Sequence, residues 1–214
     1  MAEEHIIKAV KEALNKAPER KFKETVELAI NLKDIDLANP KNRITEEVIL
    51  PRGRGKEVKI GLFGTPEMMG KARGVADLIF GAEEISKMAE EKSETKKKVN
   101  EVDFFVAEAP LMAVVGKNLG VILGPRGKMP RPIPPGADPT PIIGNLRKTV
   151  KVRSKDRRTF HVPVGMRDMD PKDLASNIEA VLGRIRSKLE RGYMNIHSVY
   201  VKTTMGPAVR IELR

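Results

Sequence analysis

The segment VYVKTTMGPAVRIELR near the end of the chain carries a row of side chains that can form hydrogen bonds. If it is extended, Ser198, Tyr200, Lys202 and Thr204 share one face, and the valines between them face a core. Hydroxyl groups both donate and accept hydrogen bonds, which suits them to the ribose 2′-hydroxyls and base edges of an RNA minor groove. The pattern therefore offers a binding surface.

This row ends at Thr204, Met205, Gly206 and Pro207, an unusual sequence for a strand interior. Strands disfavour glycine, and proline cannot donate to the hydrogen-bond ladder. Because Gly206 has no Cβ, a nucleic acid could approach the backbone directly, and Met205 offers a flexible apolar contact. A bulge beside a turn explains the same residues without any ligand, and on this segment alone it is the simpler interpretation.

A second unusual stretch, LGVILGPRGKMPRPIPPGADPTP, is rich in glycine and proline and carries Arg126, Lys128 and Arg131. It could present backbone groups and positive charge to a phosphate backbone, or be only a rigid surface loop. It is not a P-loop, because Met129 stands where a Ser or Thr would hold magnesium and Ile122 where the first glycine belongs. GLFGTPEMMG also lacks the glycine spacing of a dinucleotide site.

Other catalytic chemistry finds little support. The chain has no cysteine, which excludes disulfides, thiolate metal sites and cysteine nucleophiles. Its three histidines, His5, His161 and His197, have no metal-ligand spacing. No pair of carboxylates is marked as catalytic. We therefore predict no enzyme activity and no cofactor, with a nucleotide-dependent enzyme as the alternative to test.

Charge points to a polyanionic partner. The net charge is +11, and residues 151–214 hold 14 Lys and Arg against 7 Asp and Glu. Aromatic residues make up only 4% and tryptophan is absent, which disfavours a binder that stacks single-stranded bases. A general polyanion binder, or charge that serves solubility alone, remains the alternative. No apolar run approaches the roughly 18 residues of a membrane helix, so no membrane partner is expected.

The two ends of the chain have a similar pattern. A helix is predicted over 3–16, and FKETVELAINL alternates as a strand with Phe22 on the apolar side. ITEEVILP is expected to be its hairpin partner. Toward the other end, RTFHVPVG predicts a strand, and Asp170 is the expected N-cap of a long helix that stops near Gly192.

Between these ends, short apolar strands alternate with helical segments from residue 58 onward, which predicts a mostly parallel, doubly wound sheet. The fold class is therefore α/β (α+β) with two domains. Residues 1–57 and 151–214 pair into one discontinuous α+β domain, a layer of helices on an antiparallel sheet, and residues 58–150 are inserted into it.

In this order and spacing, RKFKETVEL, GRGK, LGPRGKMPRP, HVPVG and VYVKTTMGP resemble the ribosomal protein L-one family, and the short form is similar to its archaeal members. The resemblance implies a split, ferredoxin-like RNA-binding domain with an inserted Rossmann-like domain. It implies a structural role in the stalk of the large ribosomal subunit, where the protein binds large-subunit ribosomal RNA mainly through the first domain and assists release of deacylated E-site tRNA. It also implies repression of translation through an operator in the protein's own mRNA.

The resemblance further implies a cytoplasmic, ribosome-associated protein that is a monomer off the ribosome, and it assigns RNA-binding residues by motif. In the family Phe22 touches RNA, whereas the alternation pattern places it in the core, and both interpretations stay open. Lys23 stands where bacterial members commonly have an acidic residue and offers an extra phosphate contact. The residues assigned to RNA are Lys21, Phe22, Glu24, Thr25, Asp156, Arg157, His161, Ser198, Thr204, Met205 and Gly206.

Overall fold

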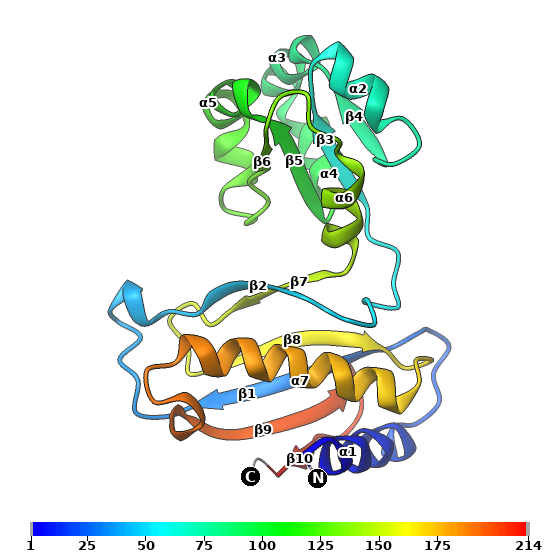
Figure 1. Ribbon diagram of the computed structural model, residues 1–214, viewed down its shortest axis with the longest axis vertical. Coiled ribbons are helices and arrows are strands. Elements are labelled where there is room, and N and C mark those ends of the chain that lie inside the picture. The colour runs from blue at the N-terminus through cyan, green and yellow to red at the C-terminus, as the bar shows by residue number, and fades with distance from the viewer. Residues whose placement is uncertain (1, 213–214) are drawn as a thin grey trace. The chain divides into compact units, whose positions relative to one another are not determined.

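The structure is a computed structural model that describes residues 2–212, and it has the mixed α/β fold predicted from the sequence. The chain divides into two compact units (Figure 1). Unit 1 contains Met1–Lys56 and Lys148–Arg214, and unit 2 is Glu57–Arg147. The chain ends thus share one unit, and the segment between them forms the other.

Unit 1 is built on a four-stranded antiparallel sheet in the order β10-β9-β1-β8. β1, from the first half of the chain, lies between two strands from the second half. The strands are β1 (Thr25–Leu32), β8 (Thr159–Met166), β9 (Ile196–Thr203) and β10 (Val209–Ile211).

The predicted hairpin between the first two strands is wrong. β2 (Thr45–Ile49) pairs with β7 (Thr149–Arg153) in a separate two-stranded antiparallel sheet. The reason is that both edges of β1 already carry hydrogen-bonded partners, β8 on one side and β9 on the other. The loop between β1 and β2 contains a short 3-10 helix, Pro40–Asn42.

Two helices, α1 (Ala2–Lys16) and α7 (Pro171–Lys188), pack against each other and against the sheet (Figure 1). The alternate residues Val26, Leu28 and Ile30 of β1 point into the core that these helices cover. The Asp170 side chain accepts a hydrogen bond from the Lys172 N–H at 2.7 Å, as an N-cap does. α7 ends at Lys188, before Gly192, and a 3-10 turn (Gly192–Asn195) leads into β9.

β1 begins three residues later than the alternation pattern suggests. Phe22 precedes the strand and is 54% exposed, so its assignment to the core is wrong. Glu24, which interrupts the apolar pattern, is fully buried just before the strand. The core face of the strand therefore starts at Val26.

Unit 2 contains a four-stranded parallel sheet in the order β4-β3-β5-β6, as the alternation of strands and helices predicted. The charged segment that follows β4 forms two helices, which meet at Glu91. The strands are β3 (Ile60–Phe63), β4 (Leu78–Phe80), β5 (Phe104–Glu108) and β6 (Arg131–Ile133). The helices are α2 (Pro66–Ala72), α3 (Ala82–Glu90), α4 (Lys92–Glu101), α5 (Met112–Leu123) and α6 (Thr140–Arg147), with a 3-10 turn (Ala109–Leu111) before α5.

Two basic side chains of the Gly/Pro-rich loop, those of Arg126 and Lys128, are engaged within unit 2. The Lys128 ammonium donates to the carbonyls of Val99 and Asn100 at 2.8 and 3.2 Å, and Arg126 Nε donates to the Asn100 side chain at 3.1 Å. These carbonyls lie in the last turn of α4, where backbone acceptors lack partners within the helix. Partial burial of the ammonium lowers the pKa of Lys128. Lys128 thus caps a helix.

We predict that Lys128→Met destabilises unit 2, because two carbonyls at the end of α4 lose a charged donor. The expected loss is about 1–3 kcal/mol of unfolding free energy. Urea unfolding combined with faster amide exchange in α4 measures it. Lys117→Met, at an exposed lysine of α5, is the matched control and should leave both unchanged. Equal stability of the two variants would contradict the capping role.

Candidate nucleic-acid interface

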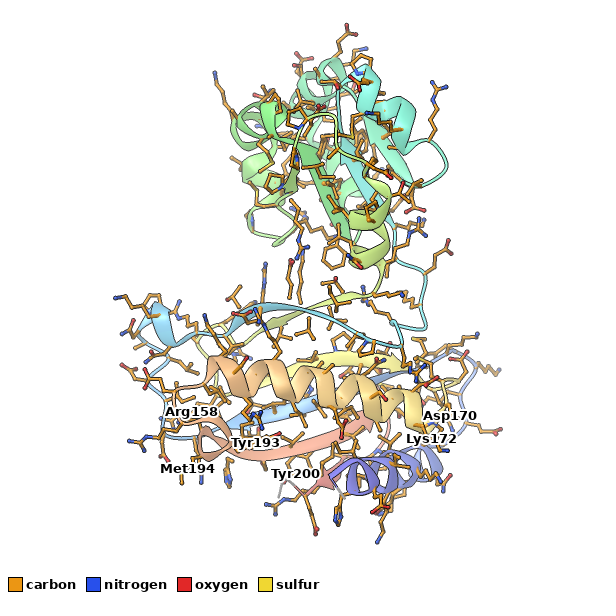
Figure 2. The ribbon with its side chains drawn as sticks, viewed as in Figure 1. Arg158, Asp170, Lys172, Tyr193, Met194 and Tyr200 are labelled. Carbon is orange, nitrogen blue, oxygen red and sulfur yellow. The ribbon has the colours of Figure 1, made fainter. Side chains whose placement is uncertain are left out.

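The sheet of unit 1 has a polar outer face, on the side opposite the core residues. The pairing register aligns its side chains in three rows across the strands. The rows are Pro163, Glu27 and Lys202; His161, Ala29, Tyr200 and Arg210; and Thr159, Asn31 and Ser198. Figure 2 labels Tyr200 on β9 in the middle row.

Side-chain hydrogen bonds fix the row that lies near the start of β9. Thr159 Oγ1 donates to Asn31 Oδ1 at 2.7 Å, and Asn31 Nδ2 donates to Ser198 Oγ at 2.9 Å. Ser198 is largely buried. Because Asn31 supplies the donor, the Ser198 hydroxyl hydrogen is free for another acceptor. This row is a preformed set of polar groups spanning three strands.

The middle row combines small, aromatic and basic groups. Ala29 lies between His161 and Tyr200, and Arg210 follows on the edge strand. His161 and Arg210 are exposed, and Tyr200 is half-buried. The motif resemblance assigned His161 to RNA but left out Tyr200, Lys202 and Arg210. Strand alternation in the sequence places Tyr200 and Lys202 on the polar face. For Arg210, only its pairing with Tyr200 shows that it lies on this face.

The turn after β9 is hydrogen-bonded to the start of β1. The Thr204 N–H donates to the Thr25 carbonyl at 2.9 Å, and Thr204 Oγ1 approaches the same carbonyl at 3.1 Å. Thr204 Oγ1 also lies 3.4 Å from Glu27 Oε1. Thr204 and Met205 are exposed, Met205 at 57%. Residues about 180 apart in the sequence thus form one surface.

Gly206 is required by packing inside the protein. A Cβ at this position would collide with Thr203 Oγ1 and would lie 3.1 Å from the Ala17 side chain. Thr203 is fully buried, and its hydroxyl has no hydrogen-bond partner among residues 2–212. The sequence argument, that this glycine makes room for a nucleic acid, missed this close approach to Thr203 and Ala17.

Glu24 lies beneath the same turn and has no exposed surface. One of its carboxylate oxygens accepts a hydrogen bond from the Met205 N–H at 3.1 Å, and the other accepts from Arg167 Nη1 at 3.1 Å. Arg20 Nε lies 3.8 Å from the first oxygen. Of the eleven predicted RNA-binding residues, Glu24 is the one whose side chain faces inward at this end of the sheet.

Three neighbouring side chains are exposed at this end: Lys21, Phe22 and Lys23. The Lys23 ammonium forms an ion pair with Asp168 at 2.9 Å, and this contact lowers the pKa of the Asp168 carboxyl group. Lys23 would have to leave this carboxylate, or share it, to contact a phosphate. Lys21, two residues earlier in the chain, is also exposed.

Asp156 and Arg157 lie at the opposite end of the sheet. They precede β8, whose last residue, Met166, pairs with Thr25. An eight-residue strand is roughly 26 Å long, so these two residues are a strand length from the Thr204 turn. Ser198 and His161 lie between the two ends. The predicted residues therefore do not form one cluster but follow the outer face from end to end.

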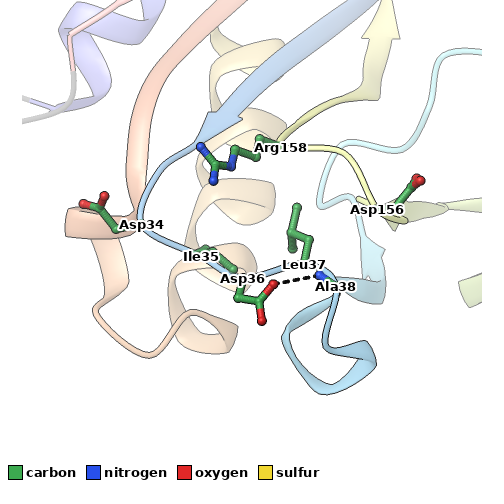
Figure 3. A pocket seen from close by; sticks show the side chains of 7 residues that line it. All are labelled: Asp34, Ile35, Asp36, Leu37, Ala38, Asp156 and Arg158. Carbon is green, nitrogen blue, oxygen red and sulfur yellow. Dashed lines mark hydrogen bonds between the residues drawn. The ribbon is translucent and has the colours of Figure 1, made fainter.

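The end that holds Asp156 contains an open depression of about 470 Å³ (Figure 3). Asp156 and Arg158 line one part of it, and the loop after β1 lines the rest. That loop is held by a hydrogen bond of 3.0 Å from the Ala38 N–H to Asp36 Oδ1. This end therefore combines carboxylates with the guanidinium of Arg158.

Residues 2–212 contain no group of three or more His, Asp or Glu placed to hold a metal ion. No helix within the same residues has the length and apolar character needed to cross a membrane. The polar sheet face and its adjoining turn are the candidate site.

Comparison with known proteins agrees with this fold. The family model of the ribosomal protein L1p/L10e family matches residues 10–207. The chain is 62% identical to large ribosomal subunit protein uL1 of Thermoplasma acidophilum, over 96% of this chain and 94% of the relative. It is 56% identical to the protein of that name from Picrophilus torridus, over 96% and 95%, and 50% identical to that of Methanocella arvoryzae, over 99% and 100%. The family consists of ribosomal proteins and not of enzymes. The chain belongs to the ribosomal protein L1p/L10e family.

Proposed function

We propose that this protein is a cytoplasmic component of the large ribosomal subunit and that unit 1 binds large-subunit ribosomal RNA. Its relatives carry the name of a large-subunit protein. The observation that carries the proposal is the joining of Thr204 to the Thr25 carbonyl. This contact places an exposed hydroxyl, Met205 and Phe22 at one end of a polar sheet face.

Recognition in this proposal is by shape. Lys21, Arg157 and Lys202 contact phosphates and supply affinity that falls with salt. The hydroxyl groups of Ser198 and Thr204 contact 2′-hydroxyls in a minor groove and supply selectivity. Preformed hydrogen bonds support the selective role of the two hydroxyls, because Asn31 orients that of Ser198 and the Thr25 carbonyl orients that of Thr204.

The finer roles follow from the family resemblance. We propose that units 1 and 2 are the two domains expected at residues 1–57 with 151–214 and at 58–150, and that the protein is a monomer off the ribosome. On the ribosome it belongs to the stalk and assists release of deacylated E-site tRNA. Off the ribosome it binds an operator in its own mRNA and represses translation. Binding of the mRNA leader in competition with ribosomal RNA tests the last role.

Footprinting on large-subunit ribosomal RNA tests the main proposal. We expect protection of one helical, looped region, and tight binding of that fragment at fixed salt. A general polyanion binder would bind duplex DNA, heparin and the fragment alike at matched salt. Equal affinity for all three would reject selective RNA recognition.

We predict that Thr204→Val weakens binding of the protected fragment by about 1–3 kcal/mol at fixed salt, because an RNA group loses its polar partner. Filter binding or fluorescence anisotropy measures the dissociation constant. Thr45→Val makes the same chemical change at an exposed position of β2 and should leave affinity unchanged. Equal dissociation constants for the two variants would show that Thr204 is not part of the interface.

We also predict that Lys202→Gln makes the negative slope of log affinity against log salt shallower by about 0.7–0.9, the value for one phosphate contact. The loss of affinity at a given salt concentration should be similar for all RNAs tested. Lys172→Gln removes the same charge at the start of α7, in the helix layer of unit 1 (Figure 2). If both lysines change the slope equally, the sheet face is not the phosphate-binding side.

Unit 2 provides a further test. We expect Lys128→Met to leave the affinity for the ribosomal RNA fragment within about twofold, because Lys128 serves α4 of unit 2. The measurement is a titration at a temperature where the variant is folded. A loss of tenfold or more would mean that the inserted unit carries the main RNA contacts.

A further inference from the structure

The turn Thr204–Gly206 is held from below by the buried carboxylate of Glu24, which pairs with the half-buried guanidinium of Arg167. We infer that they form a clamp that positions the turn for RNA, so that Glu24 is a positioning residue and not an RNA contact. This inference rests on the proposed function for its RNA-binding part. Its structural part stands on contacts within unit 1.

Glu24 uses both carboxylate oxygens. Oε1 accepts from the Met205 N–H at 3.1 Å, and Oε2 accepts from Arg167 Nη1 at 3.1 Å. The side chain is 0% exposed, so a ligand cannot reach it without opening the turn. A buried carboxylate needs such partners, because burying an unpaired charge is costly.

Arg167 connects this carboxylate to the segment after α1. Its guanidinium donates to the Ala17 and Pro18 carbonyls at 2.9 and 2.8 Å. Its backbone N–H donates to the Glu24 carbonyl at 2.9 Å. The Arg167 side chain is 25% exposed, and its bonds to Ala17 and Glu24 are partly buried. One guanidinium thereby fixes where the chain enters β1.

The clamp joins three segments that are far apart in the sequence: residues 17–24, the residue after β8, and the turn after β9. The exposed groups of the proposed interface lie directly on these segments. Lys21 and Phe22 precede Glu24 in the chain, and Thr204 and Met205 surround the amide that Glu24 binds. Ala17 also lies beneath Gly206, where a Cβ would lie 3.1 Å from it. The relative position of Phe22 and Met205 therefore depends on Glu24.

The Glu24→Gln variant distinguishes a role of Glu24 in positioning the turn from an effect of its charge on RNA binding. A carboxylate offers two acceptors, whereas a carboxamide offers one acceptor and one donor. Glutamine can satisfy Arg167 or the Met205 N–H, but not both. Electrostatics alone predicts tighter RNA binding, because a negative charge is removed beside a polyanion. Positioning predicts the opposite sign, with affinity lower by about tenfold or more.

The matched control is Asp168→Asn. Asp168 lies at the same end of unit 1, is exposed, and pairs with Lys23. This variant removes the same charge without touching the turn, so RNA affinity should stay equal or rise. The salt slope should be unchanged in Glu24→Gln, because no phosphate contact is lost.

The experiment measures amide hydrogen exchange and binding to the footprinted ribosomal RNA fragment for both variants and the parent protein. We expect faster exchange at the Met205 amide in Glu24→Gln, with unchanged protection of the Val201 amide inside β9, and weaker binding. Unchanged exchange at Met205, or binding as tight as that of the parent protein, would overturn the clamp. If Glu24→Gln does not fold, Arg167→Lys replaces it, since lysine keeps the charge but cannot make the three guanidinium bonds, and the same outcomes decide.

The two proposals can fail separately. If the parent protein shows no preference for the ribosomal RNA fragment over duplex DNA, the proposed function is wrong. Exchange at the Met205 amide then still decides whether Glu24 holds the turn, because that measurement needs no RNA.

Discussion

The structure of unit 1 depends on the hydrogen bonding of β1 to strands from the other end of the chain. β1 pairs along its length with β8 on one side and with β9 on the other. These pairings fix which residues of three distant segments lie side by side, because a shift of one residue would turn every side chain to the opposite face. Both the apolar core and the polar outer face follow from this single register.

The polar face is organised before any ligand arrives. Asn31 connects Thr159 with Ser198, and the Thr25 carbonyl receives both the amide and the hydroxyl of Thr204. Ordering a mobile side chain on binding costs free energy, so groups that are already fixed lose less. In the proposed function, few aromatic residues are available for stacking, and such fixed polar groups select one folded RNA by its shape.

The sequence predicted those features that depend on local pattern. Alternation identified the core face of β1 from Val26 onward, and Asp170 was recognised as an N-cap because the capping residue and Pro171 are adjacent. Partner choice between strands is non-local, and so the pairing of β2 with β7 was missed.

For the candidate site, the motifs predicted which residues carry polar groups but not how each one is used. Phe22 is exposed because β1 begins only at Thr25. Glu24 and Gly206 belong to the motif, yet contacts with Arg167, Thr203 and Ala17 account for them. The contacts with Arg167 and Ala17 join positions separated by more than 140 residues, which no local pattern contains.

The acidic residues of this surface are each engaged within the protein, which is compatible with the proposed binding of a polyanion. Glu24 is buried against Arg167, and Glu27 lies near both His161 and the Thr204 hydroxyl. A carbonyl oxygen can only accept, so the bond between Thr204 Oγ1 and Thr25 makes the hydroxyl the donor. Its lone pairs are then left for an incoming donor. A ribose 2′-hydroxyl is such a donor and deoxyribose has none, so an exposed hydroxyl oriented in this way favours RNA over DNA.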